Sequence, residues 1–386
     1  MQQLLYFNID IIYLFVNFLM LITFYVCGKN ISSGKTYAKN AIICIIIYSL
    51  CLGLRYGRGW DYNHYIDVYK YDLEETEVIF TYFNIFLKYI GVGPHYFFLI
   101  YNLIEIICAL VFLYPYKKFA QYIFPLFMIA TLHLNEYSIR QGLAFSFVFL
   151  SLYLFFHFYD NFKSFIKQKK IFLLFITSVV LAYGIHSVTI ITLLWVLLFA
   201  IFIRKPLPYK ITILAFVLSS YVFQNMFDLS GLNSIFSFMA NQNEKYAQYI
   251  ENSDIWFGAE GFSDRYTRNP IVKIFETLGN ASLFYLGYNV INNHFQTNKQ
   301  IITLYNVFVI GTIVQKFFQN FQILNRVCGT GVLFWFIPLG LILYYHRDFY
   351  KYRLWLFLLI WWSYEYLKYL FMCGDMCHFL WETNYF

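Results

Sequence analysis

The sequence predicts an all-α polytopic integral membrane protein with about 12 transmembrane helices, several of them short or broken. Of its 386 residues, 60% are hydrophobic and 24% are aromatic, whereas only 13% are charged. A soluble fold carries roughly 25% charged residues and could not keep so much apolar surface out of water. The apolar runs are continuous and helical in length, unlike the short alternating segments of a membrane barrel. A cytosolic enzyme, a nucleic-acid-binding domain and a disordered chain are therefore excluded.

The apolar runs divide residues 1–386 into successive spans of one membrane domain. In chain order we assign them to residues 4–26, 40–54, 95–114, 120–134, 142–158, 171–185, 187–203, 211–228, 271–290, 301–318, 331–345 and 354–372. The first run lacks the basic region and cleavage site of a signal peptide, so we expect it to remain as a helix. Residues 77–92 have an apolar face, but Glu77 and Lys88 favour a helix lying in the membrane interface.

The charges of the loops predict the orientation. Loops that carry almost only Lys and Arg all fall on one side of this scheme, and the loops on the other side have an excess of Asp and Glu. Because basic loops stay in the cytoplasm, we expect both termini outside, together with two longer segments, about residues 55–94 and 228–270. The cytoplasmic loops are all short and contain no phosphate-binding glycine motif, so any chemistry lies on the outer face and uses no nucleotide.

No cofactor or metal is required by the sequence. The seven cysteines are odd in number and irregularly spaced, which implies no disulfide framework. Cys373, Asp375, Cys377 and His378 lie close together, but a closed zinc site needs two well-spaced ligand pairs.

Polar clusters at the outer membrane edge are the candidate functional residues, because an ionisable group there costs about 2.5–3.5 kcal/mol on insertion scales. The first cluster follows the second span and contains Arg55, Arg58, Trp60, Asp61 and His64. Its arginines suit phosphate, its aromatic rings suit sugars or headgroups, and Asp61 or His64 suits acid–base chemistry. An interfacial aromatic belt with snorkelling arginines explains the same residues equally well.

Three further clusters follow along the chain. Arg140 and Gln141 open a long helix, with Glu136 four residues earlier as the local partner of Arg140. His186 lies between two short spans, and Arg326 precedes a late span. Each of these has a structural alternative, namely a salt bridge, a packed histidine and a headgroup contact. With Arg265 and Arg268 of the long loop, the outer-face arginines together suit a lipid-linked diphosphate.

These segments resemble the EpsG/Wzy-type family of exopolysaccharide and O-antigen polymerases over roughly residues 40–345. The matching pieces are Arg55-Tyr-Gly-Arg-Gly-Trp-Asp61-Tyr62 with Tyr65, Ile139-Arg140-Gln141-Gly142-Leu-Ala144, Leu181-Ala182-Tyr-Gly-Ile-His186-Ser187, and Arg326. Arg58 and Trp60 stand where the family usually has smaller residues, and Arg326 lacks a clear aromatic continuation.

The resemblance implies a glycosyltransferase-type polymerase of the bacterial cytoplasmic (inner) membrane with its site facing outside. Its donor would be a growing glycan on a polyprenyl diphosphate, and its acceptor a new lipid-linked repeat. A chain-length regulator and a flippase would be partners, beside membrane lipids. We expect Arg140 and Arg326 to bind the diphosphate, helped by Arg55, Arg58, Gln141, Arg265 and Arg268.

The base that activates the acceptor hydroxyl is expected among Asp61, His186 and Glu136, with Asp61 favoured because a carboxylate beside arginines stays ionised. A lipid-linked oligosaccharide flippase, a surface-glycan acyltransferase and a membrane scaffold are the alternatives. The flippase would line its interior with basic groups, whereas the charges inside these spans are few and balanced.

Overall fold

The structure, a computed structural model, describes residues 11–73, 77–158, 162–223, 269–319, 325, 329–348, 353–372 and 378–383. For residues 60, 162–164, 372, 378 and 382 only the backbone is described. The chain forms two compact units, residues 1–193 with 362–386 and residues 194–361.

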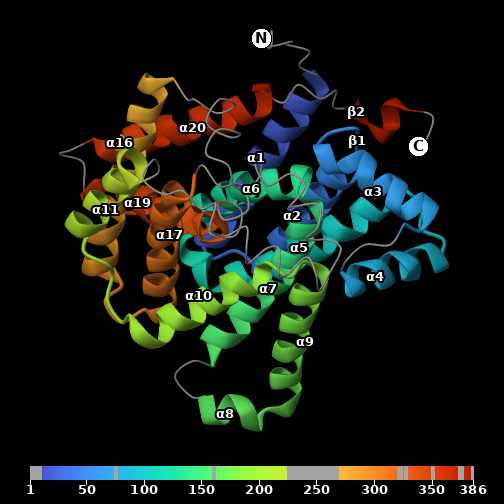
Figure 1. Ribbon diagram of the computed structural model, residues 1–386, viewed down its shortest axis with the longest axis horizontal. Helices are drawn as coiled ribbons and strands as arrows, with labels where there is room; N and C mark the ends of the chain where they lie inside the picture. Colours follow the sequence, from blue (N-terminus) through green and yellow to red (C-terminus); the bar gives the residue numbers. More distant parts are fainter. Residues whose placement is uncertain are drawn as a thin grey trace. The chain divides into compact units, whose positions relative to one another are not determined.

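Within its described residues, the first unit is built from helices and one pair of very short strands (Figure 1). Its elements are α1 (Ile11–Ser32), α2 (Tyr37–Gly53), β1 (Arg55–Tyr56), α3 (Trp60–Tyr71), α4 (Val78–Tyr89), α5 (Phe97–Leu113), η1 (Tyr114–Phe119), α6 (Ala120–Tyr137), α7 (Ile139–His157), α8 (Phe162–Lys167), α9 (Lys169–Ile185), β2 (His378–Phe379) and η8 (Leu380–Glu382).

The second unit contains α11 (Tyr209–Tyr221), α16 (Pro270–His294), α17 (Lys299–Phe317), η6 (Thr330–Trp335) and α19 (Phe336–Tyr344). Two helices, α10 (Thr189–Phe202) and α20 (Leu354–Met372), contribute residues to both units. Within the second unit α17 packs closely on η6, because a Cβ at Gly311 would stand only 2.9 Å from the backbone of Gly331. A partly buried ion pair, Lys316 Nζ to Glu276 Oε1 at 2.7 Å, joins α17 to α16.

In the part of the chain that the structure describes, four helical stretches are long and apolar enough to cross a membrane, namely Ile11–Ser32, Phe97–Tyr137, Ile139–His157 and Lys299–Phe317. Five shorter apolar helices accompany them among the described residues: Tyr37–Gly53, Val78–Tyr89, Thr189–Phe202, Tyr209–Tyr221 and Thr330–Tyr344. The prediction of an all-α polytopic membrane protein is confirmed. The stretch Phe97–Tyr137 holds two of the predicted spans, which meet at η1, where Pro115 stands at the start of a 3₁₀ turn.

The core that carries the polar motifs lies where α3, α4, α5, α7 and the end of α9 meet. One cluster of buried side chains takes Tyr62 from α3, Phe80 from α4, Phe98 from α5, Ile139 from α7 and Ile185 from α9. Each motif of the first unit therefore places a neighbouring residue in the same apolar core. This common core brings segments that are more than 100 residues apart in the sequence to one place.

Candidate functional site

The first motif is a tight turn held between α6 and the C-terminal segment. Its first two residues form β1, which pairs antiparallel with β2, so that Arg55 stands opposite Phe379. Gly57 and Gly59 follow with φ of 76° and 97°. A Cβ at Gly59 would stand 1.8 Å from the carbonyl oxygen of Glu136, so only glycine fits there. The two glycines thus let the turn pack directly on the end of α6.

Arg58 and Glu136 form a buried ion pair beneath this turn. Arg58 Nε donates to Glu136 Oε2 at 2.6 Å, and the two side chains are 2% and 0% exposed. Tyr13 Oη donates to Oε1 of the same carboxylate at 2.9 Å, and Tyr369 Oη donates to Oε2 at 2.5 Å. The guanidinium also lies 4.0 Å from the ring centre of Tyr13. The pair therefore ties α1, α6 and α20 to the turn.

Arg55 is buried as well, with 1% of its surface exposed. Its guanidinium donates to the carbonyl oxygen of Leu52, and Nη2 donates to that of Asn135 at 2.5 Å. The ring centre of Phe98 lies 5.2 Å away. Arg55 and Arg58 thus bind the protein itself, whereas the sequence led us to expect both guanidiniums at the outer surface. The β1–β2 pairing and the glycine turn fold them inward.

Arg140 lies in a second ion pair, which joins the other two motifs of this unit. Its Nη1 lies 2.8 Å from Oε2 of Glu77, the residue directly before α4. Oε1 of the same carboxylate lies 3.9 Å from Nδ1 of His186. Arg140 is 17% exposed and His186 is 20% exposed, so both side chains reach the molecular surface, unlike Arg55 and Arg58. We call Arg140, Glu77 and His186 the Glu77 centre.

The expected local pairing of Arg140 with Glu136 is wrong. Both residues lie in helices, but Ser138 stands between α6 and α7 with φ −134° and ψ 53°. This non-helical residue rotates the two helices relative to each other, so the four-residue spacing no longer places the two side chains on one face. Glu136 binds Arg58 and Arg140 binds Glu77.

His186 is placed by the end of α9. The helix ends at Ile185, and the backbone N–H of His186 donates to the carbonyl oxygen of Ala182 at 3.1 Å. The hydroxyl of Thr189 donates to the carbonyl oxygen of His186 at 2.7 Å, which fixes the short connection to α10. The residue is thus a partly exposed histidine on a well-anchored helix end.

The remaining predicted residues lie in different environments. Asp61 lies in the first turn of α3 and Gln141 in the first turn of α7, and both are half-buried. Arg265, Arg268 and Arg326 lie outside the described residues. The structure therefore brings Arg140 and His186 together around Glu77, and it brings Arg55, Arg58 and Glu136 together beneath the first motif.

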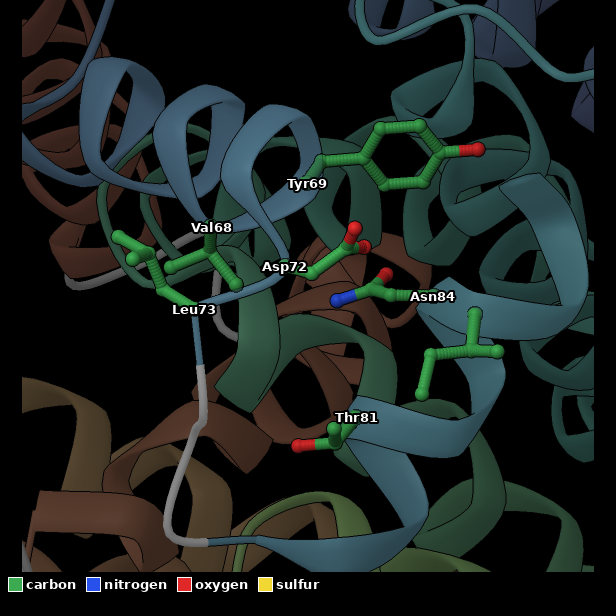
Figure 2. Close-up of a pocket in the computed structure, with 7 residues that line it drawn as sticks. Val68, Tyr69, Asp72, Leu73, Thr81 and Asn84 are labelled. Atoms are coloured by element: carbon green, nitrogen blue, oxygen red, sulfur yellow. The ribbon is translucent and has the colours of Figure 1, made fainter.

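A small cavity between α3 and α4 is separate from these ion pairs. It has a volume of about 30 Å³ and is lined by Val68, Tyr69, Asp72, Leu73, Thr81, Asn84 and Ile85. Figure 2 shows Asp72 and Asn84 pointing toward one another across it. Its volume suits a water molecule and is far too small for a sugar. Asp72 is also bound by Lys88 Nζ at 2.6 Å, on the exposed side of the two helices.

Glu77, Tyr13 and Tyr369 are the residues that the sequence did not single out. Tyr13 and Tyr369 lie inside apolar runs rich in tyrosine, so nothing in the sequence distinguishes them. Glu77 carried a signal, because it stands directly before an amphipathic helix, where the helix dipole favours a negatively charged side chain. We interpreted it instead as evidence for an interfacial helix.

Among the residues that the structure describes, no group of three or more His, Cys, Asp or Glu side chains is arranged to hold a metal ion. Cys373, Asp375 and Cys377 lie outside that part of the chain.

Comparison with known proteins assigns the family. No curated protein and no solved structure matches the chain significantly. The family model of the EpsG family matches residues 40–380, and so includes the three motifs of the first unit and the β2 strand that pairs with β1. The resemblance seen in the motifs is confirmed, and the match reaches further toward the C-terminus than they did. The chain belongs to the EpsG family.

Proposed function

We propose that the protein is a polysaccharide polymerase that joins lipid-linked repeat units by glycosyl transfer. Its family suggests a polysaccharide polymerase-type role, and its apolar helices make it a multi-pass membrane protein. The donor is a glycan attached through its anomeric carbon to a polyprenyl diphosphate, and the acceptor is a sugar hydroxyl of another lipid-linked repeat. The product is a polysaccharide of the O-antigen, capsule or exopolysaccharide type.

In the reaction the bond between the anomeric carbon and the phosphate oxygen breaks, and its electron pair leaves with the polyprenyl diphosphate. The acceptor oxygen forms the new bond to the anomeric carbon, and its proton passes to a base on the protein. The donor is already activated, so neither nucleotide nor ATP is consumed. The protein must therefore supply a cation for the leaving diphosphate and a proton acceptor beside it.

The single observation that supports this function best is the Glu77 centre. It combines a guanidinium suited to phosphate oxygens with a histidine suited to proton transfer, both partly exposed and both close to one carboxylate. Arg140 and His186 are 46 residues apart in the sequence, and their motifs share one apolar core. Both motifs lie within the residues that the family model matches. A scaffold protein would have no use for such a combination at the surface.

We assign the roles by exposure. Arg140 binds the diphosphate. His186 takes the acceptor proton, because it lies beside the same Glu77 carboxylate as Arg140, and Asp61, which is equally half-buried, is the other candidate base. Arg55 and Arg58 are buried and bound to protein acceptors, so they act by holding the first motif in place. Glu136 has both oxygens engaged by Arg58, Tyr13 and Tyr369, which suits a charge partner better than a base. Gln141, Arg265, Arg268 and Arg326 are the further proposed contacts of the diphosphate.

The proposed site faces outward from the cytoplasmic membrane, because the basic loops lie on the opposite side. Lipid-linked repeats delivered by a flippase are then its substrates, and a chain-length regulator is its partner.

Deletion of the gene tests the proposal. A cell without the polymerase still delivers single repeats to the outer face, so its surface glycan should shrink from a ladder to one repeat unit on a gel. Complementation by the intact chain should restore the ladder. Loss of the single repeat as well would contradict the proposal and would indicate a flippase instead.

A further inference from the structure

Glu77 is held in place by the first turn of α4. Its carbonyl oxygen accepts from the backbone N–H of Thr81 at 3.2 Å and from the hydroxyl of Thr81 at 3.3 Å. Its side chain is only 7% exposed. Burying a charged side chain so deeply costs free energy unless it is paired, and here Arg140 is the partner. The backbone of Glu77 is therefore fixed by hydrogen bonds, and its carboxylate is buried.

Helix α4 is in turn packed on α9, next to His186. A Cβ at Gly184 would stand 2.2 Å from Cδ1 of Ile79, so the absence of a side chain at Gly184 lets α4 approach. Phe80 is fully buried in the core shared by the motifs, and the Arg140 guanidinium lies 5.8 Å from its ring centre. The start of α4 thus places Glu77 between α7 and the end of α9.

The two oxygens of Glu77 face two different groups. Oε2 binds Arg140 Nη1 at 2.8 Å, and Oε1 lies 3.9 Å from His186 Nδ1. A carboxylate beside Nδ1 favours the tautomer that carries the proton on that nitrogen, which leaves Nε2 as a proton acceptor. The 3.9 Å separation is longer than a hydrogen bond, but such contacts commonly tighten only when substrate binds.

We propose that Glu77 is the positioning residue of the reaction: it fixes the Arg140 guanidinium and orients the His186 ring so that Nε2 faces the acceptor hydroxyl. The inference rests on the proposed function. The proton of the acceptor hydroxyl moves to Nε2 as the anomeric carbon transfers from the phosphate oxygen to the acceptor oxygen. Glu77 itself contacts neither sugar nor diphosphate, and it acts through the two residues that do.

The test is Glu77→Gln in the full-length protein, reconstituted in a bilayer with a polyprenyl-diphosphate-linked repeat as substrate. Gln keeps the shape of Glu but removes the charge that selects the tautomer. We expect kcat to fall by roughly 10- to 10⁴-fold with little rise in KM, since Arg140 remains to bind the diphosphate. Glu77→Asp keeps the charge and should retain more activity than Glu77→Gln.

Two controls separate positioning from folding. Asp72→Asn removes another carboxylate of the same region, one that is 63% exposed and bound to Lys88, and it should leave kcat unchanged. Thermal unfolding in the same bilayer should show that Glu77→Gln remains folded, and kcat is expressed per folded molecule.

The role of Glu77 is overturned if the variant turns over at the wild-type kcat, if its loss equals its loss of folded protein, or if Glu77→Asp is no better than Glu77→Gln. Each of these outcomes counts against Glu77 alone, because the wild-type protein measured beside the variants still elongates the glycan. A folded wild-type protein that elongates nothing would instead refute the proposed function.

Discussion

At the scale of single residues, the arginines divide into two kinds that the sequence alone does not separate. Arg55 and Arg58 are buried and bind carbonyl oxygens or Glu136, whereas Arg140 is partly exposed beside a histidine. All three stand in polar motifs at the ends of apolar runs, so their location near the membrane edge was predictable from the sequence. Their partners were not, because Arg58 and Glu136 are 78 residues apart and no local spacing links them.

The role of Arg140 is tested by Arg140→Lys. Lysine keeps the charge and can still pair with Glu77, but it loses the planar fork that binds two phosphate oxygens. We expect the rate of glycan elongation to fall roughly tenfold or more, since a charge-assisted hydrogen bond contributes about 1.5–3 kcal/mol and 1.36 kcal/mol corresponds to tenfold. The measurement is elongation at equal amounts of folded protein. Elongation at the normal rate would mean that Arg140 supplies only charge.

The buried pair beneath the first motif should matter for stability rather than for chemistry. Glu136→Gln leaves the Arg58 guanidinium buried without its counter-charge, and breaking a buried pair in this way costs about 3–5 kcal/mol. The free energy of unfolding in a bilayer should therefore drop clearly. Asp72→Asn is the matched control, because an exposed pair such as Asp72–Lys88 contributes about 1 kcal/mol or less. Equal stabilities of the two variants would show that the Arg58–Glu136 pair holds nothing together.

At the scale of elements, the sequence predicted helices well and tertiary contacts poorly. The predicted spans 142–158 and 171–185 correspond to α7 and α9, since long apolar runs with polar ends determine where helices lie. The pairing of β1 with β2 was not predicted, because strands of two residues have no alternation to recognise. The position of α4 on α9 depends on Ile79 meeting Gly184, a contact between residues 105 apart that a single sequence does not reveal.

The turn between β1 and α3 should be destabilised if its second glycine, Gly59, is replaced by a residue with a side chain. In Gly59→Ala the new Cβ meets the carbonyl oxygen of Glu136, and the backbone at φ 97° adds about 1–3 kcal/mol of strain. Gly34→Ala is a matched control with φ 90° and no atom within 4 Å of the new Cβ, so it carries the strain alone. We expect Gly59→Ala to lower the yield of folded protein and its thermal stability well beyond Gly34→Ala. Similar losses in the two variants would contradict the packing of the turn on α6.

At the scale of the whole molecule, the composition alone led to the correct class, a multi-pass helical membrane protein, and the motif order led to the EpsG family. The orientation is predicted from the charges of the loops. The orientation in turn determines on which side of the membrane the Glu77 centre lies. The long acidic loop that supports it, residues 228–270, lies almost entirely outside the described residues, as do three of the predicted arginines.

Cysteine labelling in a cysteine-free chain tests the orientation. Ser253→Cys in the long loop should react with an impermeant thiol reagent in cells whose outer membrane has been permeabilised while the cytoplasmic membrane is intact. Ser33→Cys, exposed between α1 and α2, should react only after the cytoplasmic membrane is broken. The reverse pattern would place the Glu77 centre on the cytoplasmic side and remove the argument for an external site.

The most direct test of the whole account is polymerisation by the purified protein in a bilayer, with lipid-diphosphate-linked repeats as the only substrate and no nucleotide present. The account predicts a ladder of longer glycans and one polyprenyl diphosphate released for each new linkage, both lost when His186→Gln and Arg140→Lys are combined. A folded protein that leaves every repeat single, or a double variant that still builds the ladder, would contradict it.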